Sequence, residues 1–391
     1  MQLRYLPSQR YELLNSFLRT SSYVLFAFLL SRGMLLGQTL PSAQTTQVRI
    51  AIVGLNHDHV WGILKDIAGE KDAQLVAIEE SDSALVTRAK SRVPASVKFF
   101  DDFVKMLDDV KPDAVIATTS NDRHLEILRE CARRHIHFST EKPMATNAAD
   151  AREMARLAQA AGIKLMVNYW NAWAPPTPAL VKHVRAGDIG PVQKIIVEYG
   201  HSGPKEIGVS KQFASWLYDP QKNGGGAIMD FGCYGAEWAI LLKGTPTRVF
   251  ATTKKIKFDQ HNEVDDDATI ILDYPDGTAI LEASWDWPYG MDRVKVFGPK
   301  GSLLATGEEL LFRDAKESRQ ENGLEGKPLT LKPLPPDLAN PVSYFVDRIQ
   351  KGKPIEDPVS ARLNVNVIAI LDAARQSSQS GRAEEIKQDS E

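Results

Sequence analysis

The chain has 391 residues, of which 43% are hydrophobic and 25% are charged, and its formal net charge is −3. This length is too great for one ordinary hydrophobic core and predicts roughly two or three domains. The charges form no long block of one sign, which argues against a nucleic-acid-binding surface or an acidic tail. The only cysteines, Cys131 and Cys233, form no CxxC pair, which excludes a cysteine zinc site and a disulfide scaffold.

Residues 1–43 differ in composition from the rest of the chain. They contain four arginines and one glutamate, and three of the arginines precede the apolar stretch Tyr23–Leu30. A basic region before a short apolar run is typical of a secretory signal peptide, and the run is too short to span a bilayer. We therefore expect a signal peptide and a periplasmic or secreted mature chain without a membrane span. If the start codon is misassigned and translation begins at Met34, the protein is cytoplasmic.

Strand-like and helix-like patterns alternate from Val48 to Asn168. The expected strands and helices alternate in this order: 48–53, 59–69, 75–79, 84–91, 97–99, 101–109, 114–117, 124–134, 136–139, 148–161 and 164–168. Such alternation predicts a parallel sheet with right-handed crossovers. We expect residues 46–168 to form a Rossmann-like nucleotide-binding domain.

Residues 169–391 are richer in strand patterns. Strands are expected at 192–199, 248–257, 268–274, 278–287 and 293–297, and helices at 178–186, 227–242 and 361–377. The turns at Asp276-Gly277 and Pro299–Gly301 predict hairpins, and hence neighbouring antiparallel strands. Residues 307–341 are rich in proline, glycine and charge, so we expect little regular structure there. The predicted fold class is α/β, with a Rossmann-like parallel-sheet domain followed by an α/β domain with a largely antiparallel sheet.

The segment Gly54–Gly62 follows the first strand, where a nucleotide-binding fold places its phosphate-binding turn. Of the three glycines of a GxGxxG turn, Gly54 remains, and Asn56 and His59 replace the other two. Asparagine tolerates left-handed backbone better than most residues. The His59 imidazole must turn away from the sheet or contact the phosphates, to which it can donate a hydrogen bond. We expect all three residues to contact a dinucleotide.

Four blocks, in order along the chain, resemble the Gfo/Idh/MocA family of oxidoreductases. They are Thr140–Ala145 with its Glu-Lys-Pro (EKP) signature, Gly162–Val167, Gly224–Tyr234, and Asn262–Ala268 continuing into Leu281–Trp285. Tyr234 stands where most members have histidine, as in the glucose-fructose oxidoreductase-like and dihydrodiol dehydrogenase-like subgroup. The resemblance implies a second domain, 169–391, that binds substrate and forms homo-oligomers through an open sheet.

The resemblance also implies catalytic roles for Lys142, Asp230 and Tyr234. In the family the EKP lysine lies beside the nicotinamide. A phenol with an ordinary pKa of about 10 is a poor base, so we expect the Lys142 charge to lower the pKa of Tyr234. A helix opening at Asp230 would put Asp230, Tyr234 and Glu237 on one face, where Asp230 orients the tyrosine or holds a neighbouring hydroxyl. The alternative is that Lys142 is a surface lysine and Tyr234 only packs.

Glu80 follows the second strand, about 26 residues beyond Gly54, and favours NAD over NADP because its carboxylate repels a 2′-phosphate. Glu141 and Lys142 are also expected at the cofactor. Family resemblance adds the residues of the loop after the fourth strand: Thr118, Ser120, Asn121 and His124. His124 has an alternative interpretation as a helix-start residue with a local hydrogen bond.

Substrate contacts are expected from Trp170, Trp173 and Trp216, because sugars pack their C–H faces on aromatic rings. A contact is also expected from Asn168, because a polar side chain suits the polar rim of a sugar. The alternative for these rings is a core or dimer contact. Two His-x-His pairs, His57/His59 and His135/His137, each offer two ligands, but no carboxylate or cysteine cluster in the sequence completes a site. We therefore expect no metal.

The sequence thus predicts an NAD(P)-dependent oxidoreductase, with NAD preferred, that transfers hydride between a sugar or cyclic polyol hydroxyl and the nicotinamide. In the periplasm a tightly held cofactor, recycled by two coupled substrates, would avoid the need for free NAD. Two alternatives remain open. One is an NAD-dependent glycoside hydrolase or lyase that oxidises its substrate transiently, and the other is a non-catalytic sugar-binding relative that lost its cofactor at Asn56 and His59.

Overall fold

A computed structural model describes residues 47–257, 263–317 and 325–386 of the chain. The expected signal peptide, residues 1–43, lies outside these residues. No helix among the described residues is long and apolar enough to cross a membrane.

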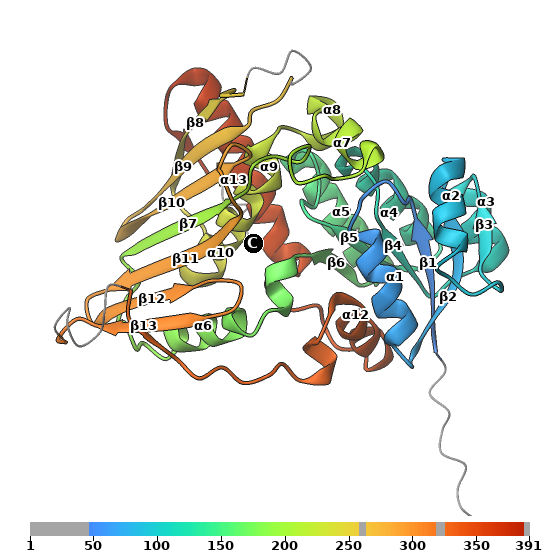
Figure 1. Ribbon diagram of the computed structural model, residues 1–391, viewed down its shortest axis with the longest axis horizontal. Helices are drawn as coiled ribbons and strands as arrows, with labels where there is room; N and C mark the ends of the chain where they lie inside the picture. The colour runs from blue at the N-terminus through green and yellow to red at the C-terminus, as the bar shows by residue number, and fades with distance from the viewer. Residues whose placement is uncertain (1–46, 258–262, 318–324, 387–391) are drawn as a thin grey trace, which may run out of the picture. The chain divides into compact units, whose positions relative to one another are not determined.

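The first sheet has six parallel strands in the order β3-β2-β1-β4-β5-β6 (Figure 1). Its strands are β1 Val48–Val53, β2 Ala73–Glu79, β3 Lys98–Phe100, β4 Ala114–Ala117, β5 His137–Glu141 and β6 Leu165–Asn168. Every residue of β4 is buried, because helices cover both faces of a parallel sheet. The strand order reverses between β1 and β4, and ligands of such sheets bind at the carboxyl ends of the strands beside this reversal.

Three of the five helices of this part of the chain begin at a capping side chain. The five helices are α1 Val60–Gly69, α2 Ser83–Lys90, α3 Phe103–Val110, α4 His124–Arg133 and α5 Ala148–Ala161. Asp82, Asp102 and Asn147 each accept a backbone N–H of the first helical turn, which satisfies donors that the helix itself leaves unpaired. The expected helices and strands up to β6 are confirmed, with ends shifted by a residue or two.

The second sheet has nine strands in the order β14-β13-β12-β11-β7-β10-β9-β8-β15. Its strands are β7 Lys194–Gly200, β8 Arg248–Lys254, β9 Asp267–Tyr274, β10 Gly277–Ser284, β11 Met291–Gly298, β12 Gly301–Ala305, β13 Leu310–Asp314, β14 Lys327–Pro328 and β15 Glu384–Glu385. Only β7 and β10 pair in parallel. The predicted fold class, with a largely antiparallel second sheet, is confirmed.

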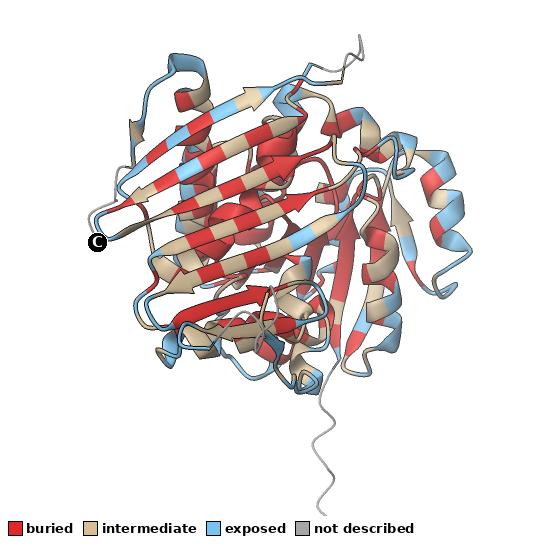
Figure 2. Ribbon diagram, turned by 60° about the vertical axis from the view of Figure 1, so that its left-hand side comes forward, coloured by how far each residue is buried: buried red, intermediate tan, exposed pale blue. Residues whose placement is uncertain are grey.

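One face of the nine-stranded sheet is covered and the other is not. Along its central strands, buried residues alternate with more exposed ones, as Figure 2 shows. Helices α10 Gly232–Lys243 and α13 Ala361–Ser380 pack on the buried face, and α13 also contacts α5 of the first sheet (Figure 1). The remaining α-helices are α6 Pro176–Arg185, α7 Lys211–Leu217, α8 Pro220–Asn223, α9 Ala227–Asp230 and α12 Pro341–Gln350.

Two expectations for the second half were wrong. Residues 307–341 contain β13, which pairs with β12; Leu310 is buried there, and the apolar Leu311 and Phe312 that follow it are partly buried. The helix expected at 227–242 is broken at Phe231, so Asp230 ends α9 instead of opening α10. In a continuous helix the Asp230 carbonyl would accept the Tyr234 N–H; here it accepts Lys142 Nζ and Cys233 Sγ, and the Tyr234 N–H donates to Phe231.

Candidate active site

Lys142 lies at the end of β5, and its ammonium group contacts Asp230 across the space between the two sheets. Lys142 Nζ donates to Asp230 Oδ1 and, at 3.0 Å, to the Asp230 carbonyl. The other carboxylate oxygen accepts the Trp285 indole N–H at 2.9 Å. Both ionic side chains are buried, so the alternative of a surface lysine is wrong. Every described polar contact of the pair is a charge-assisted hydrogen bond, which fixes its geometry.

The electrostatics of the pair keep both groups ionised. Burial by itself lowers the pKa of Lys142, but the charge of Asp230 outweighs it and the pKa is raised above its ordinary value. Burial conversely raises the pKa of Asp230, and Lys142 brings the net pKa below its ordinary value. At neutral pH the site therefore holds an ammonium group and a carboxylate.

Tyr234 lies in the first turn of α10, directly beside this pair. Lys142 Nζ lies 5.0 Å from the centroid of the Tyr234 ring, a cation–π distance. The ring stacks on Tyr199 with centroids 4.8 Å apart and meets Tyr169 edge-on at 5.3 Å. Three aromatic contacts thus hold the phenol in place.

The expected lowering of the Tyr234 pKa was wrong. Burial, and then the negative groups around it, including Asp230, raise this pKa well above its ordinary value. The Lys142 ammonium faces the ring and is paired with Asp230, so it does not offset burial of the phenol. Tyr234 is accordingly a neutral hydrogen-bond donor at physiological pH.

Tyr234 borders a cavity of about 420 Å³, which we call the tyrosine cavity. Its polar and aromatic lining includes Trp170, Asn171, Thr177, Tyr199, His201 and Phe231. Of these, only Trp170 was among the four expected substrate residues. His201 follows the strand end Tyr199-Gly200, and a polar residue just after a strand was the available signal.

Glu237 lies one helical turn beyond Tyr234 and is fully buried. Burial raises its pKa to about 8, and the hydrogen bond from Asn171 offsets part of this effect. The Asn171 amide donates to the two carboxylate oxygens at 3.2 and 2.9 Å. Asn171 therefore joins the tyrosine cavity to a buried acid beneath it, a role that the sequence analysis missed.

The structure does not bring the four expected substrate residues together. Trp170 lines the tyrosine cavity, whereas Trp173 lines a different one. The Trp173 indole donates to Asn168 Oδ1 at 2.8 Å, which makes Asn168 part of a buried network. Trp216 is buried and donates to the Asn56 carbonyl at 3.2 Å, as the core interpretation predicts.

The glycine loop retains one strict requirement for glycine. Gly54 has φ +78°, and a Cβ there would lie 2.4 Å from Thr119 Cγ2. Asn56 does not have positive φ, so the expectation that it replaces a glycine by tolerating left-handed backbone was wrong. Its side-chain Oδ1 is buried and has no hydrogen-bond partner among the described residues, which leaves an acceptor free at this loop.

Two carboxylates at the end of β2 face the same loop. Glu80 Oε2 accepts the Leu55 N–H at 2.7 Å, and Glu79 Oε2 accepts the Gly54 N–H at 3.2 Å. Burial raises the pKa of Glu79 to about 7. The donor set fits a dinucleotide, since acidic groups beside the glycine turn are what a ribose with free 2′ and 3′ hydroxyls requires.

The residues after β4 lie beside the loop as well. Thr118 Oγ1 donates to the Gly54 carbonyl at 2.5 Å, and Asn121 Nδ2 donates to Asn223 Oδ1 at 2.7 Å. The Ser120 hydroxyl donates to Asp122 Oδ1 at 2.5 Å. His124 opens α4, is fully buried and contacts the Met144 carbonyl at 3.2 Å, and burial lowers its pKa to about 4. This geometry favours the helix-start interpretation of His124.

His59 joins the glycine loop to the EKP strand. Its Nδ1 lies 2.9 Å from Glu141 Oε2 and 2.9 Å from the Trp170 indole nitrogen. Asn168 Nδ2 donates to the other Glu141 oxygen at 2.7 Å. Burial lowers the pKa of the neighbouring His57 well below its ordinary value, so this imidazole is neutral. The His59 ring thus contacts Glu141 and Trp170, with which the sequence analysis did not connect it.

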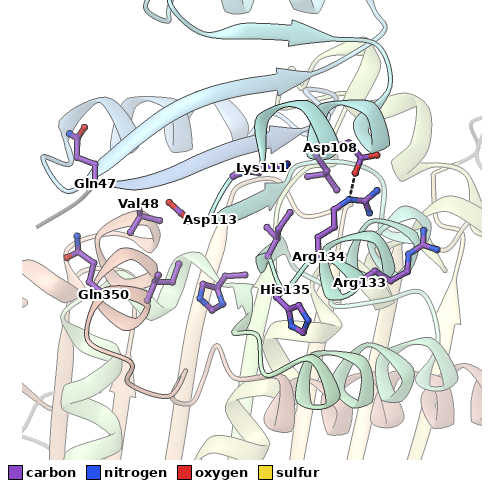
Figure 3. A pocket seen from close by; sticks show the side chains of 14 residues that line it. Gln47, Val48, Asp108, Lys111, Asp113, Arg133, Arg134, His135 and Gln350 are labelled. Carbon is purple, nitrogen blue, oxygen red and sulfur yellow. Dashed lines mark hydrogen bonds and ion pairs between the residues drawn. The ribbon is translucent and has the colours of Figure 1, made fainter.

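A second hollow, of about 790 Å³, lies at the opposite, amino-terminal ends of β1 and β5 (Figure 3). Two of its cations are paired: Arg134 with Asp108 at 2.7 Å, and Arg133 with Glu130. His135 and His137 point to separate backbone atoms, of Ala161 and Lys164. This hollow does not share the chemistry of the Lys142 centre.

Comparisons with known proteins agree with this geometry. The model for the oxidoreductase family with an NAD-binding Rossmann fold matches residues 48–169, and that for the Gfo/Idh/MocA C-terminal domain matches residues 179–304. D-apiose dehydrogenase of Paraburkholderia graminis is 26% identical over 373 residues, covering 88% of this chain and 92% of its own. D-xylose 1-dehydrogenase (NADP(+)) 2 of Haloferax volcanii is 26% identical over 325 residues, covering 82% and 93%.

Among solved structures, the aldose-aldose oxidoreductase from Caulobacter crescentus complexed with glycerol has a TM-score of 0.73 at 24% identity, covering 87% of this chain and 99% of that one. At this identity the likeness concerns the fold alone. The two family matches follow one another along the chain: the first covers the six-stranded sheet, and the second covers the nine-stranded sheet from β7 into β12. The chain belongs to the Gfo/Idh/MocA family of NAD-binding oxidoreductases.

Proposed function

We propose that this protein transfers hydride between a hydroxyl of a sugar or cyclic polyol and NAD, with Lys142, Asp230 and Tyr234 at the reacting carbon. One observation carries the proposal: the buried Lys142 ammonium lies 5.0 Å from the Tyr234 ring centroid, and Tyr234 borders the 420 Å³ tyrosine cavity. The cavity has the size and the mixture of aromatic and polar groups that suit a small cyclic polyol. Two relatives are named as dehydrogenases of apiose and of xylose.

The residues of the chain supply the proton chemistry, and NAD, when bound, accepts or returns the hydride. Lys142 stabilises negative charge on the substrate oxygen, since a fixed ammonium in a buried site acts strongly on a developing alkoxide. In carbonyl reduction the neutral Tyr234 phenol donates its proton to the same oxygen, and in alcohol oxidation the deprotonated phenol takes the hydroxyl proton. Asp230 fixes Lys142 in position and keeps it charged. Because both donors hold their protons at neutral pH, the resting site is suited to carbonyl reduction, and alcohol oxidation should gain rate as pH rises.

NAD is favoured over NADP by the two carboxylates beside the glycine loop. A 2′-phosphate beside Glu80 would bring its negative charge close to the Glu80 carboxylate, whereas Glu79, with a pKa of about 7, adds only part of a negative charge at neutral pH. One relative carries NADP(+) in its name, so the preference of this chain depends on these side chains and not on the family. The proposed cofactor contacts are Gly54, Asn56, His59, Glu80, Thr118, Ser120, Asn121, His124, Glu141 and Lys142.

Export and assembly belong to the same proposal. The basic and then apolar composition of residues 1–43 supports secretion to the periplasm or beyond. The uncovered face of the nine-stranded sheet supports a homo-oligomer, since Phe250 and Ile271 form a cross-strand pair there and are 37% and 36% exposed.

The first experiment is mass spectrometry of the ligand released from natively purified, denatured protein. NAD in the released fraction supports the proposal. Steady-state NADH formation with a panel of aldoses and inositols then separates an oxidoreductase from an enzyme that oxidises its substrate transiently. A protein that neither carries nor binds a nicotinamide nucleotide would contradict the proposal, as would wild-type turnover in both Lys142→Ala and Tyr234→Phe.

A further inference from the structure

Two histidines of the glycine loop and one glutamate of the EKP strand form a cluster of metal-ligating side chains. One ring nitrogen of each of His57 and His59 and one carboxylate oxygen of Glu141 lie within 4.8 Å of one another. His57 and Glu141 are buried, and the His59 side chain is 27% exposed. Within the part of the chain that the structure describes, no other three such side chains converge in this way. The proposed proton chemistry at Lys142 does not use His57 or His59.

The contacts of His59 cannot all be satisfied by protein groups. Glu141 Oε2 and Trp170 Nε1 both lie 2.9 Å from His59 Nδ1. A protonated Nδ1 donates to Glu141, but it then has no lone pair with which to accept the Trp170 N–H. An unprotonated Nδ1 accepts the Trp170 N–H, but its lone pair then faces the Glu141 carboxylate, which has no proton to donate. A cation between Nδ1 and Oε2 removes this conflict, because both atoms then offer it a lone pair. Trp170, which is 41% exposed, is free to turn its N–H to water.

The spacing suits a transition-metal ion. Zinc binds nitrogen and carboxylate oxygen at about 2.0–2.2 Å, so neighbouring ligand atoms on one ion lie about 3–3.5 Å apart. The separation of His59 Nδ1 and Glu141 Oε2, 2.9 Å, is close to this range. The full set spans up to 4.8 Å and must contract by about 1 Å to close on an ion. The partly exposed His59 side chain, at the start of α1, has the freedom to make that movement.

Outer contacts orient the ligands as they do in metal sites. Asn168 Nδ2 donates to Glu141 Oε1 at 2.7 Å, which leaves Oε2 directed at His59. Trp173 in turn donates to Asn168 Oδ1 at 2.8 Å and fixes the amide. The His57 ring packs against Phe213, with centroids 4.3 Å apart. Such a hydrogen-bonded and apolar shell positions first-sphere ligands and raises their affinity.

We propose that His57, His59 and Glu141 bind a divalent first-row transition-metal cation of the Zn²⁺ type. Two imidazoles and one carboxylate are a donor set of such ions, whereas Mg²⁺ and Ca²⁺ require mostly oxygen ligands. Three protein ligands leave at least one coordination position for water or another oxygen ligand. The sequence predicted no metal because it showed no third ligand near His57 and His59. This proposal replaces that expectation, because β5 brings Glu141 to the loop.

Because His59 and Glu141 are also proposed cofactor contacts, the test uses the full chain after chelation and removal of bound nucleotide. It measures the metal directly, so failure of metal binding is distinguishable from failure of the proposed function. Co²⁺ is titrated while visible d–d absorption is followed, and equilibrium dialysis with Zn²⁺ gives the stoichiometry. We expect one ion per chain and displacement of Co²⁺ by Zn²⁺. His59→Ala and Glu141→Gln should each weaken binding by more than about 100-fold. Far-UV circular dichroism checks that each variant is folded.

The chain supplies a matched control in its other His-x-His pair. The double variant His135→Ala/His137→Ala removes two imidazoles that contact separate backbone atoms, and it should bind as the wild type does. His59→Cys adds a positive readout, because a thiolate on Co²⁺ produces a near-ultraviolet charge-transfer band. Any of four results would overturn the proposal. They are binding of less than one ion per chain, equal metal affinity in His59→Ala and the wild type, loss of metal binding in the control, and no new absorption band in His59→Cys.

Discussion

The Lys142 centre and the His57/His59/Glu141 cluster lie on either side of the same EKP strand end. They differ in how far their polar groups have hydrogen-bond partners. At Lys142 the ammonium group, the Asp230 carboxylate and the Trp285 indole each have a defined partner. At His59 two groups compete for one ring nitrogen. The first region is therefore preorganised by the fold alone, whereas the arrangement of the second depends on what binds there.

The largest effect is expected from Lys142→Ala. The substitution removes the charge that stabilises the substrate oxygen and leaves Asp230 buried without its counter-ion. We expect turnover to fall about 10³-fold or more and the free energy of unfolding to fall by about 3–5 kcal/mol. Steady-state kinetics and urea unfolding measure the two losses, and Lys65→Ala, at an exposed position, is the control. An unchanged free energy of unfolding would show that the centre is not preorganised by this pair.

Glu237→Gln tests the buried acid beneath the centre. The folded-state pKa of about 8 lies above the unfolded value, so the folded protein holds a proton that the unfolded chain releases. The free energy of unfolding of the wild type should therefore fall between about pH 4.5 and 8, by up to about 1.4 kcal/mol per pH unit. The variant should lack this contribution and be more stable than the wild type above pH 8. Parallel pH dependences of the two proteins in urea unfolding would contradict the prediction.

Tyr234→Phe separates proton donation from packing. The ring keeps its stacking on Tyr199, so stability should change by less than about 1 kcal/mol, while turnover should fall about 10²-fold through loss of the donor. Tyr289→Phe, at a residue that is 64% exposed, is the matched control. A loss confined to KM would mean that the phenol only binds substrate.

Trp170→Phe should have the smallest effect. It removes one of the two competitors for His59 Nδ1 at a residue that is 41% exposed. The free energy of unfolding should change by less than about 1 kcal/mol, because one of the competing contacts is unsatisfied in either tautomer. Thermal or urea unfolding measures the change. A loss of several kcal/mol would show that the Trp170 hydrogen bond is fully formed and that the loop is as well satisfied as the Lys142 centre.

Much of the fold could be predicted from local patterns. The alternation of strand-like and helix-like patterns predicted the six strands and five helices of the Rossmann sheet, because hydrophobic period is a property of short segments. The break in the helix at Phe231 could not be predicted, because there the Asp230 carbonyl accepts a hydrogen bond from Lys142, which is 88 residues away in the sequence. The strand β13 was missed because its apolar residues are flanked by charge and glycine.

The sequence by itself determined the family and the order of the elements up to β6, and it singled out Lys142, Asp230 and Tyr234 as candidates, because motif and periodicity are properties of consecutive residues. Only the tertiary structure decided the charge state of these groups, since burial and distance set a pKa. It likewise decided that Tyr234 is a neutral donor and that Trp173 and Trp216 lie away from the tyrosine cavity. The tertiary structure also decided that His57 and His59 lie beside Glu141, which is 82 residues beyond His59 in the sequence. The reason is that parallel strands bring distant residues to one edge of a sheet.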